Sequence, residues 1–360
     1  MKPKAIRTVL TERVGLEYPI IQAPLAGGGD APELAAAVSN SGGLGFIGAA
    51  YLTREQILAA AREVRARTSR PWGINLFAPT PIPSTPTNLD AAVQRVTIYT
   101  QELGLPAPAL PVIPKSEFEE QLAGCLESGA PVFSFTFGLL PPSAMEKLKA
   151  SKTFVMGTAT TVEEAIALEQ AGVDAIVAQG SEAGGHRGTF AGSFESGMVG
   201  TIALVPQIVD AVKVPVVASG GIMDGRGIAA ALVLGAAGVQ MGTAFLACEE
   251  SGISEAYRSA ILSAHEDQTR ITRAFSGRPA RGILNRFMTE MEQTPDEILP
   301  FPWQNNLTRA LRREASRQNR REYLSLWAGQ GVRMAKGRTA AELVQGLVVQ
   351  CWQAMRMRLS

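Results

Sequence analysis

Short apolar runs recur along the chain, and eight of them have the length expected of buried strands. Within each run, apolar residues follow one another instead of alternating with polar ones, which is typical of parallel strands covered on both faces. We expect these strands at residues 20–24, 44–47, 73–77, 132–136, 153–157, 175–179, 216–220 and 239–242. The apolar runs stay well below the roughly 18 residues that a membrane helix needs.

Segments with the signals of helix ends separate the strands. A Thr followed three residues later by Glu or Gln predicts a capping box, in which both side chains satisfy free amides at the start of a helix. This pattern occurs at Thr53 with Gln56, Thr161 with Glu164 and Thr339 with Glu342. Eight strands that are each followed by a helix favour an α/β fold, a closed (β/α)8 TIM barrel, although an open doubly wound sheet gives a similar pattern.

Two segments do not fit a simple alternation of strand and helix. The stretch between the third and fourth strands is rich in proline, is too long for one crossover and predicts a helix over 90–103. After the eighth strand, residues 249–333 contain helical pieces and no clear strand. We therefore predict a barrel formed by residues 1–248 and 334–360, with a closing helix over 340–357. Residues 249–333 are predicted to be a helical insertion, or lid, over the barrel mouth.

Composition narrows the class of protein. The 360 residues are 46% hydrophobic and 19% charged, which is globular and excludes a disordered chain. With a formal net charge of +1, the chain has no field that would attract nucleic acid or a membrane surface. The first residues lack a signal-peptide pattern, and Cys125, Cys248 and Cys351 have no spacing typical of a zinc motif or disulfide framework. We expect a cytoplasmic protein without nucleic-acid or membrane partners.

Two glycine-containing loops follow the seventh and eighth strands. Gly220 and Gly221 come after the seventh strand, and Gly242 and Thr243 come after the eighth. In such barrels these two loops bind phosphate, because backbone amides and the start of a short helix face the anion. The two loops together predict a phosphate site. The alternative for Gly220 and Gly221 is that they serve only a tight turn.

Amide side chains end two other strands. Asn75 ends the third strand and Gln179 ends the sixth. Each amide offers a donor and an acceptor, which suits the edge of a heterocyclic ring. The alternative is that each amide serves only its own loop. Ala23, Pro24 and Leu25 close the first strand with a rigid backbone, which we expect to lie against such a ring.

One of the two histidines lies in the loop after the sixth strand. His186 directly follows Gly184 and Gly185. An imidazole with an ordinary pKa near ~6.5 is suited to moving a proton near neutrality. The alternative is a histidine that supports the glycine loop by a hydrogen bond. We expect no metal, because no second His or Cys lies at ligand spacing, and we expect His265 at the surface.

Three further features each admit two interpretations. Ser134, near the end of the fourth strand, is a candidate to bind substrate or to cap the next turn. Six arginines between positions 309 and 321 fall partly on one side of a helix, which favours a solvated face and leaves an interaction patch as the alternative. The loop 327–331 is a candidate cover for a bound ring, or else a hinge of the insertion.

Six motifs, in order along the chain, resemble the nitronate monooxygenase family, formerly called 2-nitropropane dioxygenase. They are Gln22-Ala23-Pro24, Asn75-Leu76-Phe77, 134–138, 179–188, 218–222 and Gln240-Met241-Gly242-Thr243. The resemblance implies a TIM barrel that holds FMN non-covalently, and His186 matches the active-site histidine of the family. Together with the loops described above, the resemblance implies a set of residues that contact the flavin. These are Ala23, Pro24, Leu25, Asn75, Gln179, Gly184, Gly185, Gly220, Gly221, Gln240, Met241, Gly242 and Thr243. The family often has Met where this chain has Leu25.

The reaction that the resemblance implies converts an alkyl nitronate and O2 into a carbonyl compound and nitrite. Propionate 3-nitronate is the substrate class that it suggests. FMN supplies the redox chemistry, while the protein positions it and tunes its charge. In this interpretation His186 orients the anionic nitronate as an imidazolium, or deprotonates a neutral nitroalkane. The neighbouring Arg187 is given no catalytic role.

Two other functions fit the sequence. A flavin-dependent enoyl-acyl-carrier reductase has a similar Gly-Gly-His loop, needs NADH and would use a basic patch, for which the arginines between 309 and 321 are candidates. The second is a barrel that binds flavin without catalysis. Chemistry like that of IMP dehydrogenase needs a nucleophilic Cys in the loop after the sixth strand, where this chain has His186 and no Cys.

Overall fold

A computed structural model describes residues 3–27, 29–81, 83–112 and 117–356. Eight parallel strands form its centre, paired in the order β1-β9-β8-β6-β5-β4-β3-β2. They are β1 (Ile20–Gln22), β2 (Gly45–Gly48), β3 (Trp72–Phe77), β4 (Val132–Thr136), β5 (Phe154–Ala159), β6 (Ala175–Gln179), β8 (Val216–Ser219) and β9 (Gly238–Met241). A parallel bridge between Ile21 and Leu44 joins the two ends of the order. The predicted TIM barrel is confirmed.

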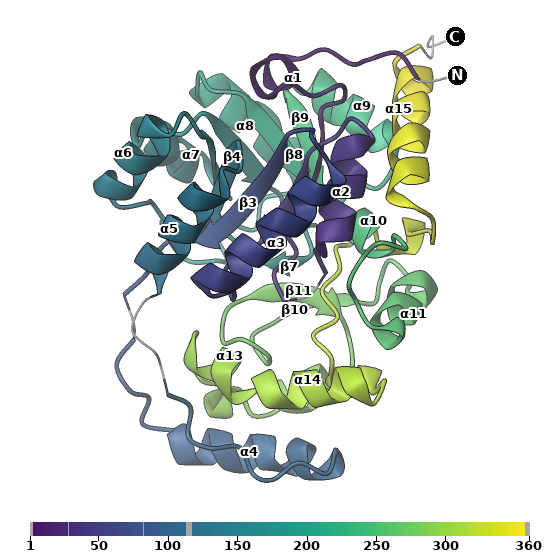
Figure 1. Ribbon diagram of the computed structural model, residues 1–360. Coiled ribbons are helices and arrows are strands. Elements are labelled where there is room, and N and C mark those ends of the chain that lie inside the picture. The colour runs from purple at the N-terminus through teal and green to yellow at the C-terminus, as the bar shows by residue number, and fades with distance from the viewer. Residues whose placement is uncertain (1–2, 28, 82, 113–116, 357–360) are drawn as a thin grey trace.

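Helices surround the barrel, as Figure 1 shows. They are α2 (Pro32–Asn40), α3 (Arg54–Arg67), α5 (Phe118–Ser128), α6 (Pro142–Ala150), α7 (Val162–Gln170), α8 (Thr201–Ala211), α9 (Gly225–Val233) and α15 (Ala340–Arg356). Apolar side chains fill the layer between strands and helices, so the strands are covered on both faces. The prediction for α15 extended to residue 357, and the predicted barrel segment to 360; positions 357–360 lie outside the described residues.

Two of the three predicted capping boxes are reciprocal. Thr53 pairs with Gln56 at the start of α3, and Thr339 pairs with Glu342 at the start of α15. The third is incomplete, because the carboxylate of Glu164 accepts hydrogen bonds from Thr160 and from the amides of residues 190 and 191. Through these hydrogen bonds, the fully buried Glu164 fixes the loop that follows the glycine-histidine segment.

The amino end of the barrel is closed by α1 (Val9–Val14). Leu10 of this helix is fully buried and belongs to the cluster that fills the barrel interior at this end. Phe46 and Met156 are among the other members of that cluster. This end of the barrel is packed with apolar side chains, which leaves the carboxyl ends of the strands as the place for a site.

Residues 249–333, which we call the cap segment, lie below the barrel in Figure 1. Their elements are α11 (Glu255–Ser263), β10 (Thr269–Thr272), β11 (Ala280–Ile283), α12 (Arg286–Met291), η1 (Pro295–Glu297), α13 (Trp303–Leu307), α14 (Arg309–Arg317), η2 (Arg321–Tyr323) and η3 (Val332–Met334). The short α10 (Thr243–Leu246) precedes them. The expectation that this segment has no strand is wrong: β10 and β11 form a hairpin. Each strand has only four residues, too few for a clear period-2 pattern.

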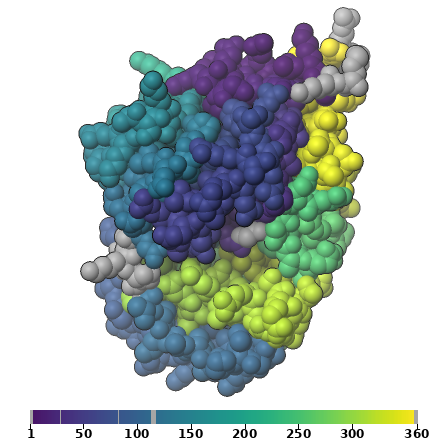
Figure 2. Space-filling view, in the orientation of Figure 1, coloured from purple at the N-terminus to yellow at the C-terminus, as the bar shows by residue number. Residues whose placement is uncertain are grey.

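The predicted helix in the proline-rich stretch is present as α4 (Leu89–Glu102), and it packs against the cap segment. Tyr99 of α4 lies 4.9 Å from Phe287 of α12, measured between ring centroids. Glu102 accepts two hydrogen bonds from the guanidinium of Arg286. Figure 2 shows the α4 segment on the outer side of the cap segment, remote from the barrel. Two stretches far apart in sequence thus share one apolar core.

Among the helices of the described residues, none combines the length and apolar composition needed to cross a membrane. All three cysteines, Cys125, Cys248 and Cys351, are free and buried.

Candidate active site

A cavity of about 800 Å³ lies at the carboxyl ends of the barrel strands and extends to the cap segment. This volume is within the range common for small-molecule sites. Its wall contains every residue that the sequence predicted for the site. These are Ala23, Pro24, Leu25, Asn75, Ser134, Gln179, Gly184, Gly185, His186, Gly220, Gly221, Gln240, Met241, Gly242 and Thr243. Six strand ends therefore contribute to one cavity; the contacts that these residues make with a ligand remain predictions.

The cap segment holds His186 in place. Gly185 and His186 form the short strand β7 (Gly185–His186), which pairs antiparallel with β11, so that His186 lies opposite Ala280. The Nε2 atom of His186 is 2.8 Å from the Oγ atom of Ser276. The rings of Phe137 and Trp327 flank the imidazole, with centroid distances of 6.0 and 5.4 Å. Both the backbone and the ring of His186 are thus fixed by residues distant in sequence.

The hydrogen bonds of Ser276 assign the proton on the imidazole. Ser276 Oγ is 3.1 Å from the carbonyl oxygen of Arg278, which can only accept, so the hydroxyl donates there. The lone pairs of Oγ are then left to accept from Nε2–H of His186. Nδ1 carries the lone pair of the neutral ring, and none of the described residues makes a hydrogen bond to it.

The charge state of His186 differs from what the sequence led us to expect. Burial lowers the pKa of the imidazole to about 3, and the positive charges of Arg278 and Arg312 act in the same direction. Both effects disfavour a second proton on the ring. His186 is therefore a neutral imidazole at neutral pH, where an ordinary value near ~6.5 would have left part of it charged.

Arg187 and Arg278 have different environments beside this histidine. Arg187 is 1% exposed, and its guanidinium donates to the carbonyl oxygens of Gln179, Gly180 and Gly197. These hydrogen bonds fix the loop after β6. The guanidinium carbon of Arg278 lies 3.7 Å from the ring centroid of Phe137, so that a positive charge stands close to the histidine pocket.

The two predicted amide side chains behave differently. Gln179 donates through Nε2 to the carbonyl of His186 and accepts through Oε1 from the amide of Gly188. Its amide thus serves its own loop, as the alternative interpretation held. Asn75 donates to the hydroxyl oxygen of Ser134 at 2.8 Å, and its Oδ1 accepts no hydrogen bond from the described residues. Asn75 therefore has a free acceptor next to the cavity.

The loops after β8 and β9 bring free amides to one side of the cavity. Gly221 has φ +70°, a left-handed conformation that glycine adopts without strain. Within the described residues, the N–H groups of Gly221 and Thr243 donate to no backbone or side-chain acceptor. The hydroxyl of Thr243 accepts from the amide of Gly329 and so ties the loop to the cap segment. Unpaired amides of this kind suit an anion.

A carboxylate supports the loop after β1. Asp30 Oδ2 accepts hydrogen bonds from the amides of Leu25 and Gly48. Burial raises the pKa of this carboxyl from 3.8 to about 7, although the two backbone donors lower it. Asp30 therefore fixes the backbone of Leu25, which lines the cavity.

The loop 327–331 packs closely on the loop after β6. The amide of Gln330 donates to the carbonyl of Glu182. A Cβ atom added to Gly184 would lie 2.5 Å from the nitrogen of Gly329, so only glycine allows this approach. Trp327, Gly329 and Gly331 line the cavity. The position of the loop thus agrees with a cover over the site.

Sequence reasoning missed several parts of the cavity wall. Tyr51 and Tyr257 of this wall carry no motif that identifies them. Ser276 lies outside the wall and reaches His186 only through the fold. Arg309, Arg312 and Arg313 of α14 also line the cavity. The sequence shows that these arginines are three and four residues apart and so share one side of a helix. It does not show that this side of the helix lines the cavity.

Two expectations concern groups outside this wall. His265 is exposed, as predicted, and follows the end of α11. In the described part of the chain, no group of three or more His, Cys, Asp or Glu side chains has an arrangement that could hold a metal ion.

Comparisons with known proteins agree on one family. The family model for nitronate monooxygenase matches residues 7–350. A probable nitronate monooxygenase of Staphylococcus aureus (strain N315) is 45% identical over 350 residues, which cover 97% of this chain and 98% of the relative. Among solved structures, nitroalkane oxidase from Streptomyces ansochromogenes matches with a TM-score of 0.89 and 39% identity, over 96% of this chain and 98% of that one.

A more distant structural match is FabK from Thermotoga maritima, with a TM-score of 0.78 and 29% identity over 98% of both chains. The family-model match covers nearly the whole chain, and the relatives with the higher identities carry the names nitronate monooxygenase and nitroalkane oxidase. The chain therefore belongs to the nitronate monooxygenase family, whose members are oxidoreductases.

Proposed function

We propose that the protein is an FMN-dependent nitronate monooxygenase, which converts an alkyl nitronate and O2 into a carbonyl compound and nitrite. The observation that carries the proposal is the position of His186. This neutral imidazole, held by Ser276, lines the same cavity as all the residues that the family resemblance implies. Propionate 3-nitronate represents the proposed substrate class. The three free cysteines support the expectation of a reducing, cytoplasmic compartment.

The residues of the cavity fit FMN. The unpaired amides of Gly221 and Thr243 suit its phosphate, and the free Oδ1 of Asn75 suits a donor on the ring edge. A Cβ atom added to Gly242 would lie 3.7 Å from Ala23 and Leu25, so the glycine leaves space between the two loops. When bound, FMN supplies the redox chemistry of the reaction.

The chain's own groups provide binding and proton handling. Arg278 and Arg312 bring positive charge to the histidine pocket, where it attracts an anionic nitronate. The anion in turn favours a proton on His186, because a negative charge beside the ring raises its pKa. Nδ1 is the nitrogen that receives this proton, or a proton from a neutral nitroalkane, because Nε2–H is already donated to Ser276.

The proposal is tested by purifying the protein and measuring O2 uptake and nitrite release with propionate 3-nitronate. We expect a yellow protein that is active without added NAD(P)H. A colourless protein that cannot be reconstituted with FMN would contradict the cofactor assignment. A yellow protein that takes up no O2 with any nitronate would favour a flavin-binding barrel without catalysis.

The reductase alternative is tested with the same preparation. NADH oxidation in the presence of an enoyl thioester would support it. FabK, at 29% identity, is a weaker match to this chain than the nitroalkane oxidase, at 39%. We therefore expect no NADH oxidation above the background rate of the free flavin.

A further inference from the structure

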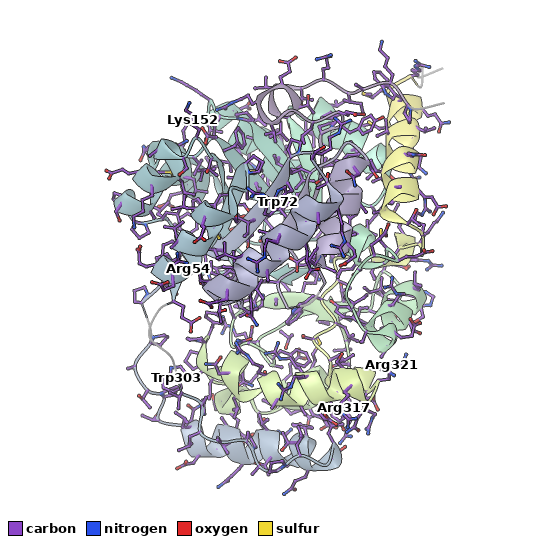
Figure 3. The ribbon with its side chains drawn as sticks, in the orientation of Figure 1. Arg54, Trp72, Lys152, Trp303, Arg317 and Arg321 are labelled. Carbon is purple, nitrogen blue, oxygen red and sulfur yellow. The ribbon has the colours of Figure 1, made fainter. Side chains whose placement is uncertain are left out.

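One face of α14 presents a row of positive charges to the cavity. Arg309, Arg312 and Arg313 all line it, and they occupy positions one helical turn apart. This spacing places the side chains of residues i, i+3 and i+4 on the same side of a helix. Arg317, the next arginine of α14, also lines the cavity, and Figure 3 shows it on this helix, on the far side of the cavity from the bulk of the barrel. The arginine row therefore forms the wall opposite the strand ends.

These three arginines form no close ion pair in the described part of the protein, and among them only Arg313 acts on the charge of Glu314, which is itself paired with Arg317. None of them is in an ion pair with a described carboxylate, whereas the next arginine of the helix, Arg317, pairs with Glu314 at 2.6 Å. Arg312 donates through Nη2 to the carbonyl and Oδ1 of Asn305, and through Nε to Thr308. Its Nη1 makes no hydrogen bond to the described residues. A cluster of guanidinium groups without close ion pairs, placed beside a cavity, is suited to an anionic ligand.

Arg312 connects this cluster with the histidine pocket. Its charge acts on His186 and on Tyr51, and Arg309 also acts on Tyr51. The guanidinium carbon of Arg309 lies 5.8 Å from the ring centroid of Tyr51. Positive charge thus extends from the exposed Arg309 and Arg313 inward past Tyr51 to the pocket of His186.

We propose that Arg309 and Arg313 bind a carboxylate at the end of the substrate remote from its nitronate group, while Arg312 lies between them and the histidine pocket. The proposal rests on the proposed function, which places the nitronate at His186. A ligand with one negative charge at each end matches the two ends of this charged row, whereas an alkyl nitronate with an uncharged tail leaves the outer arginines without a partner. The arginine row is then the determinant of specificity for nitronates that carry a second acid group.

The test compares two nitronates that differ in the tail. Steady-state O2 uptake is measured with propionate 3-nitronate and with the nitronate of 1-nitropropane, for the wild type, Arg309→Gln, Arg313→Gln and the double variant. Loss of a charge-assisted hydrogen bond is expected to raise KM for propionate 3-nitronate by roughly 10-fold to 100-fold. KM for the uncharged tail is expected to change less than about twofold. Arg321→Gln, an exposed arginine outside the cavity, is the matched control.

A binding measurement keeps the inference separate from catalysis. Calorimetric titration of the holoenzyme with pentanoate and with pentanamide is expected to show binding of the acid alone, weakened in the double variant. If neither nitronate is consumed, the proposed function fails while this titration still decides on the anion site. Equal losses with both nitronates, an unchanged KM for propionate 3-nitronate, or equal binding of acid and amide would each overturn the inference.

Discussion

The Nε2 atom of His186 and the hydroxyl oxygen of Ser276 lie 2.8 Å apart, although 90 positions separate the two residues in sequence. Ser276 belongs to the cap segment, and His186 follows a barrel strand. The hydroxyl of Ser276 donates to the Arg278 carbonyl, so the contact with His186 selects the tautomer that carries its proton on Nε2 and its lone pair on Nδ1. The cap segment therefore sets the chemistry of the histidine as well as its position.

Ser276→Ala is expected to lower kcat/KM for nitronates without unfolding the protein. The variant removes one hydrogen bond worth about 1 kcal/mol, so the ratio of correctly oriented to misoriented rings falls about fivefold. The measurement is O2 uptake across pH, together with the thermal midpoint. Ser276→Thr retains the hydroxyl and should recover most of the lost activity. Equal rates in the alanine variant and the wild type would show that the ring is fixed by Phe137 and Trp327 alone.

His186→Asn is expected to remove most of the turnover while the flavin stays bound. A positioned proton-transfer group contributes roughly 10²–10⁴ in rate, which sets the size of the expected loss in kcat. Nitrite release and flavin absorbance report on the two properties separately. The control is His265→Asn, which alters the chain's exposed histidine. Unchanged turnover in the His186 variant would remove its catalytic role and leave the flavin assignment intact.

Gly242→Ala is expected to weaken FMN binding with little loss of folding stability. The added Cβ projects between the loops after β1 and β9 and meets ordinary contacts at 3.7 Å. It therefore takes space from a ligand without straining the protein. The readout is the FMN affinity of the apoprotein, measured by fluorescence titration. Gly337→Ala also places its Cβ 3.7 Å from a single neighbour, on an exposed segment outside the cavity, and should bind FMN normally.

Asp30 is expected to make the folded state less stable as pH rises from about 4 to about 7. Its pKa is about 7 in the folded protein against an ordinary 3.8, so between these values the folded state binds more protons than the unfolded chain. The free energy of unfolding then falls with rising pH, by at most about 1.4 kcal/mol per unit for one proton, and levels off above pH 7.

Asp30→Asn isolates this contribution, because its Oδ1 still accepts from the amides of Leu25 and Gly48. We expect the variant to gain stability relative to the wild type as pH rises through this range, as measured by chemical denaturation. Glu195→Gln, which neutralises an exposed carboxylate, should run parallel to the wild type. A constant difference between wild type and Asp30→Asn from pH 4 to pH 7 would contradict the argument.

The barrel and its glycine loops could be predicted from the sequence because both depend on local signals. Each strand is a largely continuous apolar run, and the site residues lie in or just after the carboxyl half of such a run: Asn75 within β3, Gln179 at the end of β6 and Gly221 two residues after β8. Parallel strands of a barrel end at one face, so these residues meet without further information. The family resemblance then pointed to the same positions.

The cap segment could not be predicted in the same way. Strands β10 and β11 are four residues long and gain their stability from pairing with each other and with β7. The helix α4 is amphipathic, but its sequence does not show whether its apolar side packs on the cap segment, as at Phe287, or on the barrel. The pKa of His186 depends on burial and on two arginines far along the chain, which no local pattern near position 186 contains.

The antiparallel pairing of β7 with β11 limits how this enzyme can be redesigned. Because the histidine segment is an edge strand of the hairpin's own sheet, replacing the whole of residues 249–333 by the equivalent piece of a relative would remove the register on which position 186 depends. Helix α14 lies outside that sheet and still lines the cavity. Exchange of this helix alone therefore keeps the strand pairing that positions His186, and the graft should retain Arg312, whose charge acts on the histidine.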